Sequence, residues 1–187
     1  YTLTVSGPGG TTSATLTIAS VGTTYANSWI VPSTARVVGA GGAFWTTDLT
    51  LMNPEAFTIS VNLKFLGHGD SGLAGPERSF TLYPMSSFVL PDVLGSEFGL
   101  ASDWGPILVR TVTGAVVTQA QTSTPGGGGT YGQSVPAVAR ANAITTTPRA
   151  ICGIRQDSDF RTNIVLVNLA EQNAQVDLLL LSSGGTA

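Results

Sequence analysis

The chain has 187 residues, which is enough for one large domain with a substantial core. Charged residues make up only 10% and the formal net charge is −3 at pH 7, so the clustered lysines and arginines of nucleic-acid-binding proteins are absent and we expect no nucleic-acid partner. The longest apolar runs fall far short of the ~20 residues that a membrane helix needs, so we also expect no membrane insertion.

Residues 1–19 alternate apolar and polar side chains around a glycine- and proline-rich turn, which predicts a β-hairpin. The run Tyr-Thr-Leu-Thr-Val-Ser-Gly-Pro-Gly-Gly, followed by Ala-Thr-Leu-Thr-Ile, resembles the closing hairpin of a bacterial Ig-like or PKD-like domain. The resemblance implies that residues 1–19 are the terminal hairpin of such a domain, present here as a fragment. Residues 20–34 are rich in serine and threonine and contain Pro32, so they are predicted to be a linker.

A duplication dominates the rest of the chain. Residues 45–66 return about 115 positions later as residues 160–181, with Thr47 to Asn53 matching Thr162 to Asn168. Matched spacing of this kind indicates one supersecondary unit used twice. Each copy has a strand, an Asn-containing turn and a second alternating strand, so we predict two β-hairpins. The repeated residues are apolar or turn-forming, which favours repeated scaffold over repeated chemistry.

Short strands, one helix and a further hairpin are expected between the two copies. The helix is predicted over residues 91–98, because Pro91 and Asp92 suit a helix start and Gly99 suits its end. The other expected elements are strands at 80–82 and 88–90, a hairpin formed by 107–112 and 115–123, a turn at 125–129 and an extended segment at 135–143.

The second copy differs from the first on its outer face. Val165, Val167, Leu179 and Leu181 are apolar where the first copy has Thr50, Met52, Lys64 and Leu66. Strands that are apolar on both faces are usually covered on both. The hairpin is therefore central in a sandwich or lacks a covering layer, and a parent protein that continues past Ala187 is expected.

Together these patterns predict an all-β fold, an Ig-like or jelly-roll-like β-sandwich over residues 35–187 with at most one short helix. Three motifs stand out in the sequence from about Tyr25 onward: Thr47-Asp48-Leu49, Arg161-Thr162-Asn163-Ile164, and Gly129-Thr130-Tyr131-Gly132-Gln133 followed by Pro136. Through these motifs the chain resembles a β-sandwich of uncharacterised secreted or cell-surface bacterial proteins. The resemblance implies no activity.

Catalytic residues are not expected. Gly69-Asp70-Ser71-Gly72 copies the nucleophile segment of trypsin-like proteases, but such a serine needs a histidine base brought from elsewhere in the fold. The sole histidine, His68, is in the same loop, so we interpret the segment as a solvated loop. Cys152 is the only cysteine; we expect it to be a buried strand residue, and no cofactor is expected.

Two binding sites are nevertheless proposed. Asp157 and Asp159 stand close together in a predicted loop, and their carboxylates offer oxygen ligands to calcium; a polar turn is the alternative. Tyr131 and Trp104 are candidates for stacking on sugars, with core packing as the alternative.

The functional hypothesis is a non-catalytic structural or adhesive module of a bacterial secreted or cell-surface protein. Its partners would be other protein chains or neighbouring domains of the same polypeptide. One alternative is a subunit of an extracellular filament or assembly joined by strand complementation. The other is a carbohydrate-binding module of a secreted hydrolase, with polysaccharide as its partner.

Overall fold

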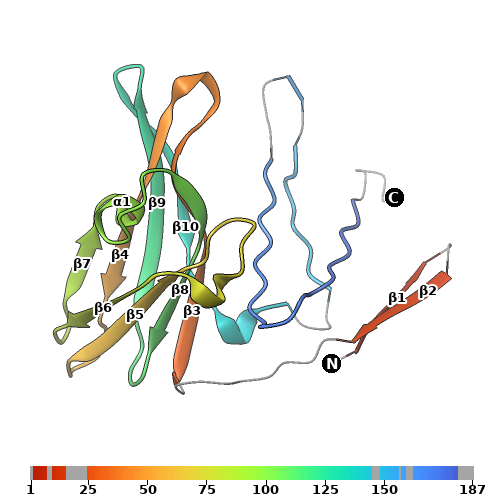
Figure 1. Cartoon of the computed structure of the whole chain (residues 1–187), viewed down its shortest axis with the longest axis horizontal. Coiled ribbons are helices and arrows are strands. Elements are labelled where there is room, and N and C mark those ends of the chain that lie inside the picture. Colours follow the sequence, from red (N-terminus) through yellow and green to blue (C-terminus); the bar gives the residue numbers. More distant parts are fainter. Residues whose placement is uncertain are drawn as a thin grey trace. The chain divides into compact units, whose positions relative to one another are not determined.

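The computed structural model describes residues 25–144, 148–155, 157–158 and 162–180, and the backbone of residues 2–7 and 10–15. The chain divides into two compact units, one of residues 22–143 with 154–167 and one of residues 1–21, 144–153 and 168–187. The first unit contains the main β-structure, labelled in Figure 1.

The fold is all-β, as the composition predicts. Among the described residues there is one α-helix, and it lies inside the predicted range 91–98. No helix in this part of the chain has the length and apolar character needed to cross a membrane. The helices and strands are β1 (Thr2–Gly7), β2 (Gly10–Thr15), β3 (Asn27–Val38), β4 (Phe44–Met52), β5 (Ile59–Phe65), β6 (Glu77–Leu82), β7 (Ser87–Leu90), α1 (Val93–Ser96), β8 (Asp103–Thr111), β9 (Val117–Gly126), β10 (Gly129–Pro136) and β11 (Val138–Ala139).

Two antiparallel layers make up the sandwich-like domain (Figure 1). One layer has the strand order β7-β4-β9-β10 and the other β6-β5-β8-β3-β11. The layers are joined at one corner, where Val37 pairs with Trp45 and Val38 with Phe44. This arrangement encloses one core between the two layers.

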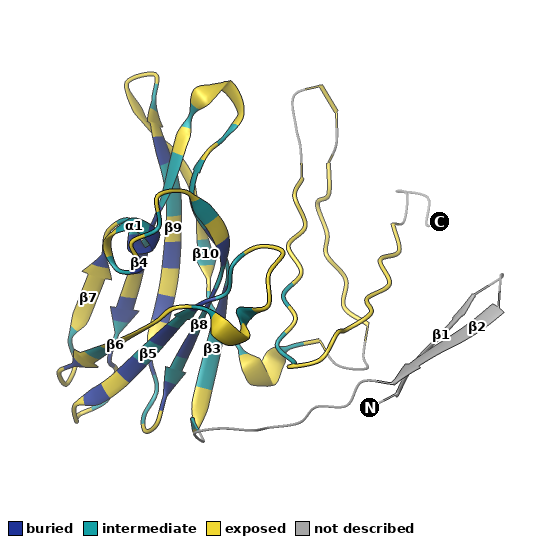
Figure 2. Cartoon of the chain, in the orientation of Figure 1, coloured by how far each residue is buried: buried dark blue, intermediate teal, exposed yellow. Residues whose placement is uncertain are grey.

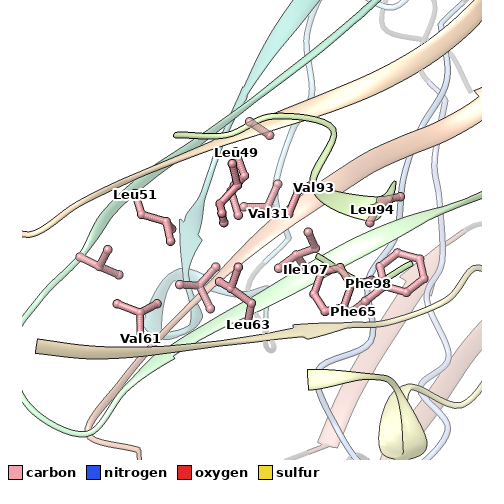
Figure 3. Packing of buried hydrophobic residues seen from close by; sticks show 14 of the residues in the cluster. Val31, Leu49, Leu51, Val61, Leu63, Phe65, Val93, Leu94, Phe98 and Ile107 are labelled. Atoms are coloured by element: carbon pink, nitrogen blue, oxygen red, sulfur yellow. The ribbon is translucent and has the colours of Figure 1, made fainter. Parts of the chain in front are cut away.

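The core follows the alternation of the strands. In β5 the side chains of Ile59, Val61, Leu63 and Phe65 are buried and the intervening residues are not, which confirms the alternation predicted for this strand. Figure 3 shows Leu49 and Leu51 of β4 on one side of the core and Val61 and Leu63 of β5 on the other. Buried and exposed positions also alternate along the central strands in Figure 2.

The predicted pairing of β4 with β5 is wrong. Within residues 44–65 these strands do not hydrogen-bond to each other, because β4 pairs with β9 and β7 whereas β5 pairs with β6 and β8. Residues 53–58 therefore form an arch that carries the chain from one layer to the other. The connection from β8 to β9 is of the same kind, so the hairpin predicted at 107–123 is also wrong.

Asn53 holds the arch together. Its side chain is fully buried, and its Nδ2 lies 2.8 Å from Phe57 O, 3.1 Å from Leu82 O and 3.0 Å from Tyr83 O. The Glu55 amide donates to Asn53 Oδ1 at 2.9 Å. One buried amide thus ties its own turn to the end of β6, since buried backbone groups must find partners.

The predicted linker also needs correction, because residues 27–34 belong to β3 and pair with β8. The linker was predicted partly because proline is rare inside strands. Proline is tolerated here because the β3–β8 register shifts between Val31 and Thr34, so the sheet has an irregularity where the missing N–H falls. Thr34 Oγ1, fully buried, donates to Gly105 O at 2.6 Å across this irregularity.

The two remaining predicted hairpins have different outcomes. β1 and β2 pair antiparallel with Gly7 opposite Gly10, which confirms the hairpin within residues 2–15. In the second copy, the described residues 162–180 contain no strand, so the expected hairpin is not formed there. The reason is non-local: β4 and β5 of the first copy are held by β8 and β9, and strand pairing needs such partners.

Candidate functional site

Trp104 lies at the start of β8, beside the loop that connects β5 to β6. The ring of His68 stacks on its indole, with centroids 3.5 Å apart and planes 22° apart. The His68 amide donates to Trp104 O at 3.1 Å, and the Trp104 amide donates to Asp103 Oδ1 at 2.7 Å. One face of the indole is therefore covered by His68, which leaves less of it for a sugar ring.

Tyr131 lies on β10, which has no paired strand on its outer side among the described residues. Its side chain is 60% exposed and lies over the β9–β10 turn, where a Cβ added to Gly127 would stand 2.9 Å from the hydroxyl. Trp104 belongs to the other layer. The structure thus places the two sugar-stacking candidates on strands of different sheets.

The protease-like segment forms a local turn. Ser71 Oγ accepts from the Leu73 amide at 3.5 Å and caps the 3-10 turn Gly72–Ala74. The Asp70 amide donates to Gly67 O at 3.4 Å. With the His68 ring stacked on Trp104, the contacts of these side chains are those of a folded loop.

The predicted calcium ligands fall in a segment that is only partly described. Arg155 Nε lies 2.5 Å from Asp157 Oδ2, so an internal cation already faces this carboxylate. Asp159 lies outside the described residues. Among residues that are described, no three histidine, cysteine, aspartate or glutamate side chains lie close enough to hold a metal ion. Cys152 is exposed, so the prediction of a buried strand residue is wrong.

A charged network on the outer face of β5, β6 and β8 is absent from the sequence predictions. Glu77 accepts from two cations, with Lys64 Nζ at 3.2 Å from Oε1 and an Arg110 guanidinium nitrogen at 2.9 Å from Oε2. Arg110 also donates to Asn62 Oδ1 at 2.5 and 3.1 Å, and its Cζ lies 4.2 Å from the ring centroid of Tyr25. The residues of this cluster face one another on neighbouring strands. Such neighbours can be identified from the sequence only once the register between the strands is known.

The network lowers the pKa of Glu77. Partial burial by itself raises this pKa, but the hydrogen bond from Lys64 and the charge and hydrogen bond of Arg110 outweigh it, so the pKa of Glu77 lies below its ordinary value of 4.5. A carboxyl group with a depressed pKa in the folded state contributes stability above its unfolded pKa. That contribution is lost as the pH falls through the folded pKa, in the range below about 4.5.

Replacing the Glu77 carboxylate should make the stability of the fold depend less on pH in the acidic range. In Glu77→Gln we expect a smaller difference in melting temperature between pH 7 and about pH 3 than in the parent chain. The effect should be modest and should shrink with added salt, because the Glu77 side chain is 40% exposed. Glu171→Gln, at an exposed position, is the matched control. An unchanged difference in Glu77→Gln would contradict the role assigned to the network.

The geometry defines the class as an all-β, sandwich-like domain. No protein-family model and no curated protein matches the chain. One solved structure, the crystal structure of Thermotoga maritima 1070, is similar to 60% of this chain and 92% of its own length, with 17% sequence identity and a TM-score of 0.48. A likeness this low carries no property over to this chain.

Proposed function

We propose that the chain is a non-catalytic structural or adhesive module, with an Ig-like or jelly-roll-like sandwich, from a bacterial secreted or cell-surface protein. One observation carries the proposal: the asparagine turn that begins the arch of the first copy is repeated in the second copy. Asn168 Nδ2 donates to Gln172 O at 2.7 Å and its Oδ1 accepts from the Ala170 amide at 2.9 Å, as Asn53 does with Phe57 O and the Glu55 amide. Repetition of scaffold is typical of modules that are strung together.

The contacts of the chemically interesting residues support the same role. His68 stacks on Trp104, Ser71 caps a turn, and Glu77 forms ion pairs with Lys64 and with Arg110. Each of these groups stabilises a loop or a sheet face. The proposed location outside the cell rests on the sequence resemblance to secreted and cell-surface bacterial proteins.

Assembly by strand complementation is the second candidate. It is favoured by β10, an edge strand without a charged residue, and by the exposed apolar side chains of residues 162–180. Uncharged edge strands and exposed apolar segments are the features through which chains pair. Light scattering on the chain separates the candidates, because a plain module stays monomeric and an assembly subunit forms oligomers.

Carbohydrate binding is the third candidate, and it predicts a specific loss. Of the two predicted stacking residues, Tyr131 is more exposed than Trp104, so a carbohydrate-binding module should lose retention on a glycan array in Tyr131→Ala. Tyr83→Ala, another exposed tyrosine, is the control. For a structural module we expect no retention that depends on Tyr131. Retention lost in Tyr131→Ala and kept in Tyr83→Ala would overturn the structural role.

A further inference from the structure

β10 is an open edge of the sandwich. It pairs with β9 along its whole length, from Gly129 opposite Gly126 to Pro136 opposite Gln119, and no described strand pairs with its other side. All of its residues except Val135 are exposed. The outer edge of β10 is therefore a row of backbone groups that can receive a further strand.

The other sheet edges carry features that keep strands of different chains from pairing. β6 contains Glu77 and Arg78, β7 has four residues and β11 has two. Charged side chains and short length are common protections of edge strands. β10 has eight residues and no charged one, and its only proline is the last residue. Among the edges that the structure describes, β10 is thus the one suited to pair with another chain.

The hairpin with β9 determines which backbone groups of β10 point outward. The strands are joined by residues 127–128, whose φ angles of +52° and +85° are those of a two-residue type I′ turn. The pair that flanks such a turn, Gly126 and Gly129, is hydrogen-bonded, and bonded pairs recur at every second residue. The Ala137 amide continues this series, because it donates to Thr118 O at 3.4 Å.

The outward groups belong to the residues between these bonded pairs. Thr130, Gly132 and Ser134 direct their N–H and C=O groups away from β9. Pro136 agrees with this assignment, because its missing N–H falls on the outer side, where an edge strand tolerates proline. The edge thus presents donors and acceptors at the spacing of an antiparallel ladder.

This edge is complementary to itself. When two copies run antiparallel about Gly132, each Gly132 faces the other, and Thr130 faces Ser134 of the second copy. Each such pair exchanges two hydrogen bonds, so every outward group of these residues finds a partner. Tyr131 faces Gln133 of the second copy in a close pair that is not hydrogen-bonded, which covers part of its exposed ring. No charged side chains oppose each other in this register.

We infer that β10 is a dimerisation strand and that its partner is β10 of a second copy, antiparallel and centred on Gly132. A strand that pairs with its own copy is related to it by a two-fold axis and uses each edge once, so the assembly closes at two chains. The pairing joins the β7-β4-β9-β10 layers of the two copies into one continuous sheet.

Charge favours this occupant over another edge of a second copy. β6 would bring Glu77 and Arg78 against an edge that has no charged residue to pair with them, whereas β10 brings none. β7 and β11 are too short to match all of the outward groups. The inference rests on the second candidate function, assembly by strand pairing, and names its contact.

Two double variants of the full chain test the pairing and its register. In Thr130→Lys/Ser134→Lys each new lysine faces a lysine of the second copy, so the dissociation constant of the dimer should rise at least roughly tenfold. In Thr130→Lys/Ser134→Glu each lysine faces a glutamate, so the constant should stay within about threefold of that of the parent chain. Both variants replace the same two exposed residues. Thr81→Lys, an exposed position on β6, is the control and should leave the constant unchanged.

Sedimentation equilibrium at increasing concentration measures the association. We expect the parent chain to approach twice its mass of 19.1 kDa and to go no higher. Amide hydrogen exchange resolved by residue locates the contact. Exchange at Thr130, Gly132 and Ser134 should slow as the dimer forms, whereas exchange at Tyr131 and Gln133 should change little, because these amides already bond to β9.

Each contrary result has a distinct meaning. A parent chain that stays monomeric at millimolar concentration would overturn both the inference and the second candidate function, and would leave the structural module standing. Undiminished association of both double variants would overturn the inference alone, because the contact would then lie elsewhere. Loss of the dimer in both variants would overturn the register about Gly132, and masses above two chains would contradict a closed pair.

Discussion

Asn53→Ala is expected to destabilise the sandwich by about 3 kcal/mol, whereas Asn168→Ala should change its stability by less than about 0.5 kcal/mol. The Asn53 side chain is fully buried and contacts three carbonyl oxygens and one amide. Its removal leaves these backbone groups buried without that partner, and each such group costs about 1–3 kcal/mol. Asn168 is exposed, so water replaces its two contacts.

Denaturant unfolding followed by tryptophan fluorescence measures both variants. Trp29, Trp45 and Trp104 lie in β3, β4 and β8, so the signal reports on the sandwich. The two asparagines occupy the same place in the repeat and differ in the later strands that they contact. Equal destabilisation by the two substitutions would mean that the turn alone, without its contact to the end of β6, accounts for the effect.

Leu63→Ala is expected to lower the stability of the sandwich by about 3–4 kcal/mol, or roughly 10 °C in melting temperature. Leu63 is completely buried between the layers, and its truncation leaves a cavity that the packed neighbours cannot fill. Leu178, its counterpart in the second copy, is 63% exposed. Leu178→Ala should therefore shift the transition by less than about 0.5 kcal/mol.

Thermal melting of both leucine variants provides the measurement. Leu63→Met serves as a conservative control, because it keeps the side-chain volume and should cost less than about 1.5 kcal/mol. A large loss in Leu178→Ala would show that residues 162–180 already contribute buried surface to the sandwich. That outcome would remove the distinction between a covered first copy and an uncovered second copy.

The parts of the fold that could be predicted are those that depend on neighbouring residues in the sequence. The inward face of β5 follows from alternation, and α1 lies within the predicted range 91–98, with Gly99 at a φ of +69° three residues after its last residue. Asp92 precedes the helix but makes no side-chain cap hydrogen bond, so it does not start the helix in the way that was predicted. The turn at Asn53 was also expected. These features depend on residues within a few positions of one another.

Strand partners could not be predicted, because alternation specifies which face of a strand is buried but does not specify which other strand pairs with it. A hairpin and an arch have the same pattern along β4 and β5, and the difference lies in contacts of Asn53 with residues about 30 positions away. The linker prediction failed because the irregularity in β3 that admits Pro32 depends on β8.

The candidate sites likewise divide into features that the local sequence indicates and features that depend on distant contacts. Tyr131, proposed from the sequence as a sugar-stacking residue, is exposed. His68 stacks on Trp104, and Glu77 pairs with Lys64 and Arg110. These contacts join residues far apart in the sequence, so no local motif indicates them. The ion pair of Asp157 with Arg155 spans two positions, and a pairing of this kind could have been weighed against calcium.

Amide hydrogen exchange on the free chain tests the central claim most directly, namely that one copy of the arch is closed by later strands and the other is open. Amides of β4 and β5 are expected to be protected to the level of global unfolding, because they pair on both sides with β7, β9, β6 and β8. Amides of residues 162–168 and 174–180 should exchange at nearly unstructured rates. Equal protection of the two copies would contradict the account.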